Sequence, residues 1–287
     1  MVSEKEMVEK LEKYLKAVRF PEDAIANTVD RIIKEGILEL EYEIIFGGYR
    51  TRTSLSINRD TFESASPESR REFGYERAAR TAHIFYDMKA KSRNPNFNIL
   101  DVGCGEGWFS NAYESQGIDN ICVDISRIAV EMSKRSRVEE EIVKTADGGE
   151  MKTYRILYDR NTNRDVRRGD VSDLNEIGLK ENEFDAVMDG GRMMMQPLVQ
   201  IILKKKKIGS AKEMCLNDLL QIKRVLKPDG NYRLVTASEK FSKYEPQYAN
   251  LSKVDLDELM KDAGYEVVNF DTLQNGEMLR YMLRNIK

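Results

Sequence analysis

The stretch ILDVGCGEGWF at Ile99–Phe109 decides the fold of this chain. An apolar run ends around the acidic residue Asp101, and three glycines then alternate with other residues before a helical pattern begins. Glycine permits a positive φ and lets the backbone approach a ligand without a Cβ in the way. The helix that follows presents unpaired N–H groups at its first turn. The stretch therefore predicts a strand, a tight turn and a helix that together bind a nucleotide-like ligand.

The composition is that of an ordinary globular protein. The chain has 287 residues, of which 41% are hydrophobic, and a net charge of −3. This charge argues against a protein whose whole surface grips nucleic acid, although a local basic groove stays compatible with it. Three scattered cysteines are too few for a disulfide framework or a metal cluster, so we expect no metal. Because no stretch approaches a membrane span and the first residues are charged rather than signal-like, we expect a cytoplasmic protein without membrane contact.

Residues 1–95 have a helical pattern. Ser3 is predicted to cap a first helix through a capping box. A broad apolar stripe predicts a second helix over Ile25–Ile44. After a possible extended segment at Tyr49–Ile57, a third helix is predicted to begin at Ser66-Pro67 and to continue towards Lys91.

Residues 96–287 form the second predicted domain, in which short apolar strands alternate with helices. The predicted strands are Ile99–Val102, Ile121–Asp124, Phe184–Asp189, Tyr232–Thr236, Glu266–Phe270 and Met278–Leu283. The predicted helices are Trp108–Gln116, Arg127–Arg137, Ser210–Leu226 and Leu256–Ala263. This alternation is typical of parallel βαβ units. The long segment 138–166 is predicted to be a hairpin-like insertion, with a strand at Thr153–Tyr158 and a turn at Arg160–Asn163.

The spacing of the three glycines distinguishes between possible cofactors. The nicotinamide fingerprint is Gly-x-Gly-x-x-Gly, whereas Gly103, Gly105 and Gly107 place the third glycine one residue early. Asp101 would repel a pyrophosphate, but it would attract a ligand that carries an ammonium group. The stretch therefore points away from a dinucleotide.

These residues resemble motif I of the class I S-adenosylmethionine (SAM)-dependent methyltransferases. Companion motifs follow in the family's order over 98–287. Asp124 ends the second strand, where the resemblance implies a contact with the ribose, and Asp170 stands in the third motif, where it implies a contact with the adenine amino group. Asp173 is the alternative for the adenine, since the insertion separates the second and third motifs. Further matches are Phe184–Asp189 as the fourth strand, Leu226–Tyr232 as the turn before the fifth, and Ala263–Val267 as the lead into the sixth.

The resemblance implies an α/β fold with a Rossmann-like, seven-stranded, mostly parallel sheet and helices on both faces. Residues 1–95 would then form a helical lid over the active site, and the cofactor would be SAM. The implied cofactor-binding residues are Asp101, Gly103, Cys104, Gly105, Gly107, Asp124, Ile125, Asp170, Val171, Asp189 and Gly190.

Methyl transfer from a sulfonium is an in-line displacement, for which a protein aligns the reactants, excludes water and, where necessary, removes a proton. His83, the only histidine, is the candidate base, and packing within its helix is the alternative role. Met193–Met195 and Ser238–Phe241 follow the fourth and fifth strands, where ligands bind in open α/β folds. They are candidates to line an acceptor pocket.

The class of acceptor can be narrowed, because the chain lacks the motifs of several known acceptor classes. Asp189–Arg192 does not match the Asp/Asn-Pro-Pro-Tyr/Phe motif of base-amine methyltransferases. The paired glutamates of protein arginine methyltransferases and the ligand set of the metal-dependent catechol type are not seen either. We therefore expect a small-molecule acceptor that is methylated on oxygen or nitrogen, rather than a nucleic acid. Two alternatives stay open: an RNA- or protein-modifying enzyme with basic contacts at Lys204–Lys207 and Arg160–Arg168, and a non-catalytic SAM-binding partner subunit.

Overall fold

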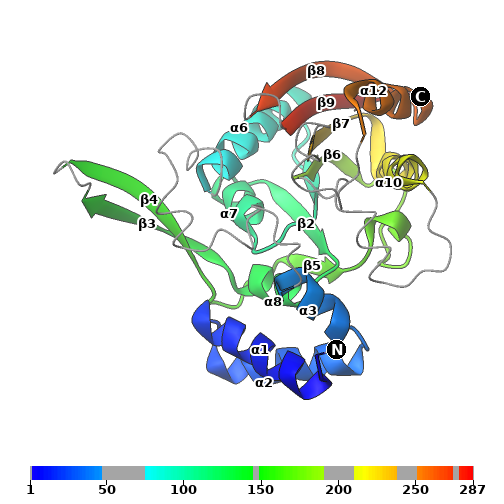
Figure 1. Ribbon diagram of the computed structural model, residues 1–287. Coiled ribbons are helices and arrows are strands. Elements are labelled where there is room, and N and C mark those ends of the chain that lie inside the picture. The colour runs from blue at the N-terminus through cyan, green and yellow to red at the C-terminus, as the bar shows by residue number, and fades with distance from the viewer. Residues whose placement is uncertain are drawn as a thin grey trace. The chain divides into compact units, whose positions relative to one another are not determined.

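The computed structural model describes residues 2–46, 75–144, 149–190, 210–237, 251–273 and 278–286 (Figure 1). The chain divides into two compact units. Unit 1 comprises Met1–Arg93, Cys104–Ile118 and Ser126–Val166, and unit 2 comprises Asn94–Gly103, Asp119–Ile125 and Arg167–Lys287. In the described ranges, no helix is long and apolar enough to cross a membrane.

Unit 2 is built on a seven-stranded sheet, with the boundary between the units passing through its edge strand β5. Its strands are β1 (Asn98–Val102), β2 (Asp119–Asp124), β5 (Asp165–Arg168), β6 (Phe184–Asp189), β7 (Leu226–Ala237), β8 (Tyr265–Leu273) and β9 (Met278–Asn285). The strand order is β5-β2-β1-β6-β7-β9-β8. β1 runs parallel to β2 and β6, and β6 runs parallel to β7, whereas β9 is antiparallel to β7 and β8. The predicted Rossmann-like, mostly parallel sheet is confirmed.

The strand order fixes where a ligand can bind in unit 2. From β1 the chain adds β2 on one side and β6 on the other, so the order reverses between β1 and β6. Ligands of open α/β sheets bind at the carboxyl ends of the strands beside such a switch point. The sequence places acidic residues at these ends.

The core of unit 2 joins the sheet to the helices α10 (Ala211–Val225) and α12 (Lys253–Asp262). Both helices begin with a capping box, made by Ser210 and Ser252 respectively. These caps fix the helix starts, so that apolar side chains at helical spacing face the strands. The core residues include Leu100, Val187, Leu219, Ile222, Leu234, Leu256, Leu259 and Tyr281, all at most 1% exposed.

One predicted turn lies inside a strand. Residues 226–232 were expected to form the turn before the fifth strand, but β7 already begins at Leu226. Phe184 of β6 pairs with Leu226, and Ala186 pairs with Asn231, so the intervening residues bulge out of the ladder. Asp229 has a φ of 63°, a conformation that Asp tolerates better than most residues. The Pro-Asp-Gly signal therefore marks a bulge rather than the start of the strand.

Unit 1 begins with three helices, α1 (Glu4–Ala17), α2 (Glu22–Lys34) and α3 (Leu38–Phe46). Ser3 is the N-cap of α1, because its Oγ accepts a hydrogen bond from the Glu6 N–H at 3.3 Å, which is one half of the predicted capping box. The single helix predicted over Ile25–Ile44 is wrong. Gly36 has a φ of +65°, and the N–H of Ile37 donates to the carbonyl of Ile32 at 3.1 Å, which are the marks of a Schellman ending. The apolar stripe continues across this break, which is why the pattern alone concealed it.

The remaining elements of unit 1 are α6 (Tyr75–Ser92), α7 (Trp108–Ser115), α8 (Arg127–Arg135), β3 (Arg137–Lys144) and β4 (Glu150–Leu157). The hairpin-like insertion is confirmed as the antiparallel pair β3–β4. The pairing runs from Arg137 and Leu157 to Lys144 and Glu150, so the expected turn at 160–163 lies after β4 and does not join the two strands. Glutamates favour helices, but here they pair across the strands, Glu140 with Lys152 at 2.5 Å and Glu139 with Arg155 at 3.1 Å.

Several predictions fall outside the described residues. They are the extended segment Tyr49–Ile57, the helix start at Ser66-Pro67, the acceptor-pocket candidates Met193–Met195 and Ser238–Phe241, and the basic run Lys204–Lys207.

Candidate functional site

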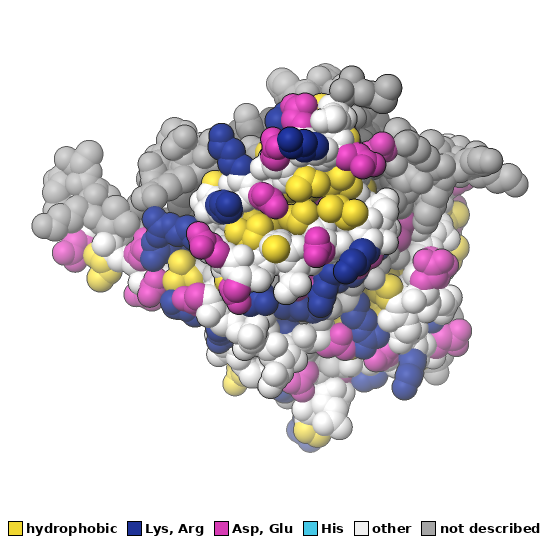
Figure 2. All heavy atoms as spheres, turned by 90° about the horizontal axis from the view of Figure 1, so that it is seen from below, with side chains coloured by type: hydrophobic (Ala, Val, Ile, Leu, Met, Phe, Trp, Pro, Cys, Tyr) yellow, Lys and Arg dark blue, Asp and Glu magenta, His cyan; other side chains and the backbone are white. Residues whose placement is uncertain are grey.

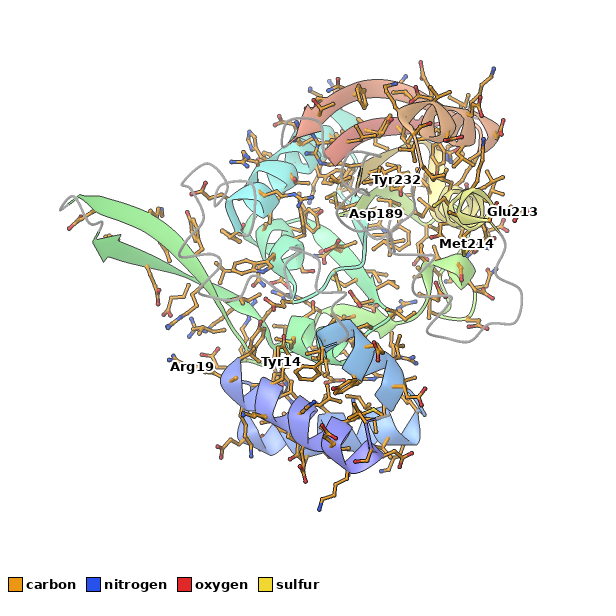
Figure 3. All side chains as sticks on the ribbon, viewed as in Figure 1. Tyr14, Arg19, Asp189, Glu213, Met214 and Tyr232 are labelled. Atoms are coloured by element: carbon orange, nitrogen blue, oxygen red, sulfur yellow. The ribbon has the colours of Figure 1, made fainter. Side chains whose placement is uncertain are left out.

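Three aspartates lie at the carboxyl ends of adjacent strands in unit 2. Asp101 is in β1, while Asp124 and Asp189 are the last residues of β2 and β6. In the register of the sheet, Asp189 stands opposite Val102, the residue after Asp101. Asp101 and Asp189 are at most 2% exposed. The hydroxyl of Tyr232 donates a hydrogen bond to Asp189 Oδ2 at 3.3 Å, and Figure 3 shows these two side chains beside each other.

The Asp101 carboxyl is the least satisfied of these groups. Its Oδ2 has no hydrogen-bond partner among the described residues. Burial, with a smaller contribution in the same direction from the nearby Asp124 and Asp189 carboxylates, raises the pKa of Asp101 to about 8. A buried carboxyl with an unpaired oxygen is costly on its own. A ligand with a cationic group would supply both the missing hydrogen bond and the missing charge.

The third motif lies against the end of β2, as the resemblance implies. The N–H of Gly169 donates to the carbonyl of Asp124 at 2.9 Å, and Arg168 Nε donates to the carbonyl of Ile125 at 3.1 Å. Asp170 Oδ1 accepts from the N–H of Ser172 at 3.0 Å and so caps the short 3-10 helix η1 (Val171–Asp173). Within unit 2 the structure therefore joins the second and third motifs through the backbone, despite the insertion between them.

The glycine turn combines positive φ angles with close packing. Gly103, Gly105 and Gly107 have φ values of 70°, 54° and 90°. A Cβ on Gly107 would lie 2.7 Å from Ser136 Oγ and 2.8 Å from Ser133 Oγ. The third glycine is thus required both by its φ and by the side chains packed against it in unit 1.

The other predicted cofactor residues are mostly buried and apolar. Cys104, Ile125 and Val171 are 4%, 6% and 2% exposed. Gly190 is half-buried and directly follows β6. The role of these residues as cofactor contacts stays a prediction.

Glu106 was not singled out from the sequence, although it lies between two of the motif's glycines. It is 8% exposed in unit 1. Burial raises the pKa of Glu106 to about 7, and hydrogen bonds with Tyr158 and Trp108 oppose this rise. Burial, together with the Glu106 charge and Tyr14 of α1, raises the pKa of the Tyr158 hydroxyl well above its usual range. No local pattern indicates this pair, because Tyr158 lies far along the chain in the insertion.

His83 lies on the exposed side of α6. Its ring stacks on that of Tyr86, with 6.3 Å between the centroids and 9° between the planes. The opposite side of the helix is buried through Ala82 and Phe85. This position gives His83 a ring partner within its own helix, although the side chain is exposed rather than partly buried, and its role as a base stays a prediction.

We expect His83→Gln to leave methyl transfer and binding of S-adenosylhomocysteine (SAH) within about twofold of the wild-type values, since exposed substitutions away from special contacts have small effects. Isothermal titration with SAH and transfer of labelled methyl from SAM measure the two quantities. A large loss of transfer with normal SAH affinity would instead identify His83 as the base.

Comparison with known proteins identifies the family of the chain. Residues 93–282 match the family model described as a methyltransferase domain. Because the match spans well over half of the chain, the protein belongs to this methyltransferase family. It is a SAM-dependent methyltransferase, with S-adenosylmethionine as its cofactor.

Several solved structures are similar to this chain at low sequence identity. A SAM-dependent methyltransferase from Clostridium acetobutylicum is 12% identical with a TM-score of 0.51, covering 76% of this chain and 95% of that chain. The 1,6-didemethyltoxoflavin-N1-methyltransferase of Burkholderia thailandensis, solved with 1,6-didemethyltoxoflavin and SAH, is 20% identical with a TM-score of 0.46, covering 80% and 87%. A SAM-dependent methyltransferase from Methanosarcina mazei is 15% identical with a TM-score of 0.47, covering 69% and 96%. The comparison with curated proteins finds no match.

The residues of unit 2 fit this cofactor. SAM carries an α-ammonium group and a ribose diol, and the carboxyl edge of the sheet offers the unpaired Oδ2 of Asp101 and the carboxylate of Asp124. Carboxylates are suited to accept hydrogen bonds from both groups.

Proposed function

We propose that this protein transfers the methyl group of SAM to an oxygen or nitrogen of a small-molecule acceptor. In this proposal Asp101 receives the ammonium group, Asp124 the ribose hydroxyls and Asp170 the adenine amino group. The observation that carries the cofactor assignment is the buried, unpaired Oδ2 of Asp101 at the switch point of the sheet. Residues 1–95 are proposed to cover the acceptor, and the free state of all three cysteines supports a reducing cytoplasm.

The chemistry asks little of the protein beyond placement. Bound SAM supplies a methyl group that is already activated by the sulfonium charge. The chain has to hold the cofactor in one orientation, exclude water and bring the acceptor in line with the methyl carbon. Orientation is the task of the aspartates. Asp101 and Asp124 are held by neighbouring strands of the sheet, and Asp170 is held as the N-cap of η1.

The use of the arginines in the insertion supports a small acceptor over RNA. Arg160 and Arg164 bind Glu114, while Arg167 and Arg168 donate to backbone carbonyls. Arginine side chains that are already bound to groups within the fold are poorly placed to neutralise the phosphates of an RNA. On the face drawn in Figure 2, the lysines and arginines among the described residues are interspersed with aspartates and glutamates.

The experiment that tests the proposal uses SAM with a deuterated methyl group and a cell extract separated into small molecules, RNA and protein. We expect the mass shift to appear in the small-molecule fraction. Label in RNA or protein would overturn the acceptor class. Absence of label in every fraction, with SAH binding intact, would instead support the non-catalytic partner.

A further inference from the structure

A buried glutamate of the N-terminal helices caps helix α8 within unit 1. Glu41 of α3 is 0% exposed. Its Oε2 accepts a hydrogen bond from Ser126 Oγ at 2.7 Å, and its Oε1 accepts one from the N–H of Arg127. Ser126 Oγ also accepts from the N–H of Ala129 at 3.1 Å, as an N-cap residue does. Two residues that are 85 and 86 positions distant from Glu41 in the chain are thus held by one carboxylate.

A charge network reinforces the same contact. Arg127 Nη2 lies 2.5 Å from Glu35 Oε1, and its Nη1 lies 3.6 Å from Glu131 Oε1. Arg31 of α2 also binds Glu131 at 3.0 Å. The side chains of Arg127 and Glu131 are only 16% and 11% exposed, so these charges are screened less than surface pairs. Helices α2 and α3 are therefore fastened to the first turn of α8 by directed contacts.

The capped turn directly follows the segment assigned to the cofactor. Ser126 comes after Asp124 and Ile125, so the conformation of these two residues is tied to where α8 starts. A carboxylate at a helix N-terminus both accepts the free N–H groups and interacts favourably with the helix dipole. Removing it leaves the partly buried N–H of Arg127 without this acceptor and loosens the helix start.

We propose that Glu41 is a positioning residue for SAM: by fixing the start of α8 it holds Asp124 and Ile125 in the conformation that binds the ribose and the adenine. The proposal deepens the proposed function and rests on its assignment of these two residues. Linkage requires the reverse effect as well, so cofactor binding must strengthen the contact of α3 with α8.

The test is SAH affinity, measured by isothermal titration on the full chain at a temperature where every variant is folded. We expect Glu41→Ala to weaken binding by about tenfold or more, as the loss of hydrogen bonds to a buried charged group would. Glu41→Gln keeps an acceptor oxygen of the same reach and should recover part of the affinity. In the wild-type protein, SAH should slow amide hydrogen exchange in α3 as well as at Arg127.

Two variants separate positioning from stability alone. Leu15→Ala removes a fully buried side chain of α1 and should lower the melting temperature without changing SAH affinity. Glu43→Ala removes the same charge from α3 outside these contacts and should change neither. Unchanged affinity in Glu41→Ala, or an equal loss in Leu15→Ala, would overturn the proposal while leaving the cofactor assignment intact. A wild-type protein that binds no SAH would overturn both.

Discussion

The variant Asp101→Asn is expected to melt at a higher temperature than the wild-type protein at pH 8, and to bind SAH about a hundredfold more weakly. Both effects follow from the same buried carboxyl. In the ligand-free protein its charge is stabilised by no hydrogen bond to Oδ2 and is opposed by two further carboxylates. Asn has nearly the same shape without the charge, so it removes the cost of a buried carboxylate from the folded state. It also removes the partner of the ligand's ammonium group. Breaking a charged pair costs about 2–5 kcal/mol, and the expected loss of about a hundredfold corresponds to about 2.7 kcal/mol, in the lower part of that range.

The pH dependence has a definite sign. The pKa of Asp101 is about 8 in the folded protein against 3.8 for an ordinary Asp, so the folded state binds the proton more tightly than the unfolded state. Stability therefore falls as the pH rises from about 4 to about 8, at a limiting slope on the order of 1.4 kcal/mol per pH unit. The difference in melting temperature between Asp101→Asn and wild type should be small at pH 5 and largest at pH 8.

The affinity for the cofactor should change with pH in the opposite direction to the stability. A cationic ligand favours the ionised carboxyl, so SAH affinity of the wild-type protein should rise from pH 6 to pH 8, while that of Asp101→Asn stays flat. Thermal melts by circular dichroism and titration calorimetry measure the two quantities. Asp119→Asn, at the exposed start of β2, is the matched control and should change neither. Unaltered SAH affinity in Asp101→Asn would contradict the assignment of this residue.

The strands and most helices of unit 2 were predictable because their signals are local. β6 has the predicted bounds, since an apolar run flanked by polar residues marks a buried parallel strand. β5 was missed because four residues, Asp165–Arg168, carry only one buried apolar side chain. The β3 strand was missed because Glu139, Glu140 and Glu141 favour a helix locally, and their partners lie across a hairpin.

The candidate site divides in the same way. Asp101, Asp124 and Asp189 could be found because each stands at or one residue before the end of a recognisable strand. Glu41 and Glu106 could not, because what distinguishes them is burial against residues distant in the chain, and a single glutamate in a helix or a turn carries no sign of that. Polar residues that hold elements together thus need the structure, whereas polar residues that end strands do not.

Arg164 is such a residue, and Arg164→Met is expected to destabilise the protein by about 3 kcal/mol, towards the lower end of the cost of breaking a buried pair. The arginine side chain is only 3% exposed. It donates to the carbonyl of Ser133 at 2.8 Å, to Ser136 Oγ at 2.5 Å and to Asn111 Oδ1 at 2.8 Å, and it binds Glu114. Methionine fills the space but supplies none of these donors, and Ser133 O and Ser136 Oγ keep only the hydrogen bonds they share with Ser136 and Asn111. The expected loss of stability lies at the lower end because Glu114 is 35% exposed, so water can hydrate its carboxylate when the arginine is removed.

Arg160→Met is the control for this prediction, because Arg160 also binds Glu114, at 3.0 Å, but is 45% exposed. A surface pair of this kind contributes at most about 1 kcal/mol. Denaturant unfolding should therefore show a clear difference in stability between the two variants. Arg164→Lys should resemble Arg164→Met, since an ammonium group cannot reproduce the planar set of N–H donors of the guanidinium group. Equal stability of the Arg160 and Arg164 variants would show that the insertion does not depend on this arginine. A clear difference would show that Arg164 fixes the segment after β4. Arg164 Nη1 lies 3.3 Å from where a Cβ on Gly107 would stand. The arginine that holds the insertion is therefore also one of the side chains packed against the third glycine of the cofactor motif.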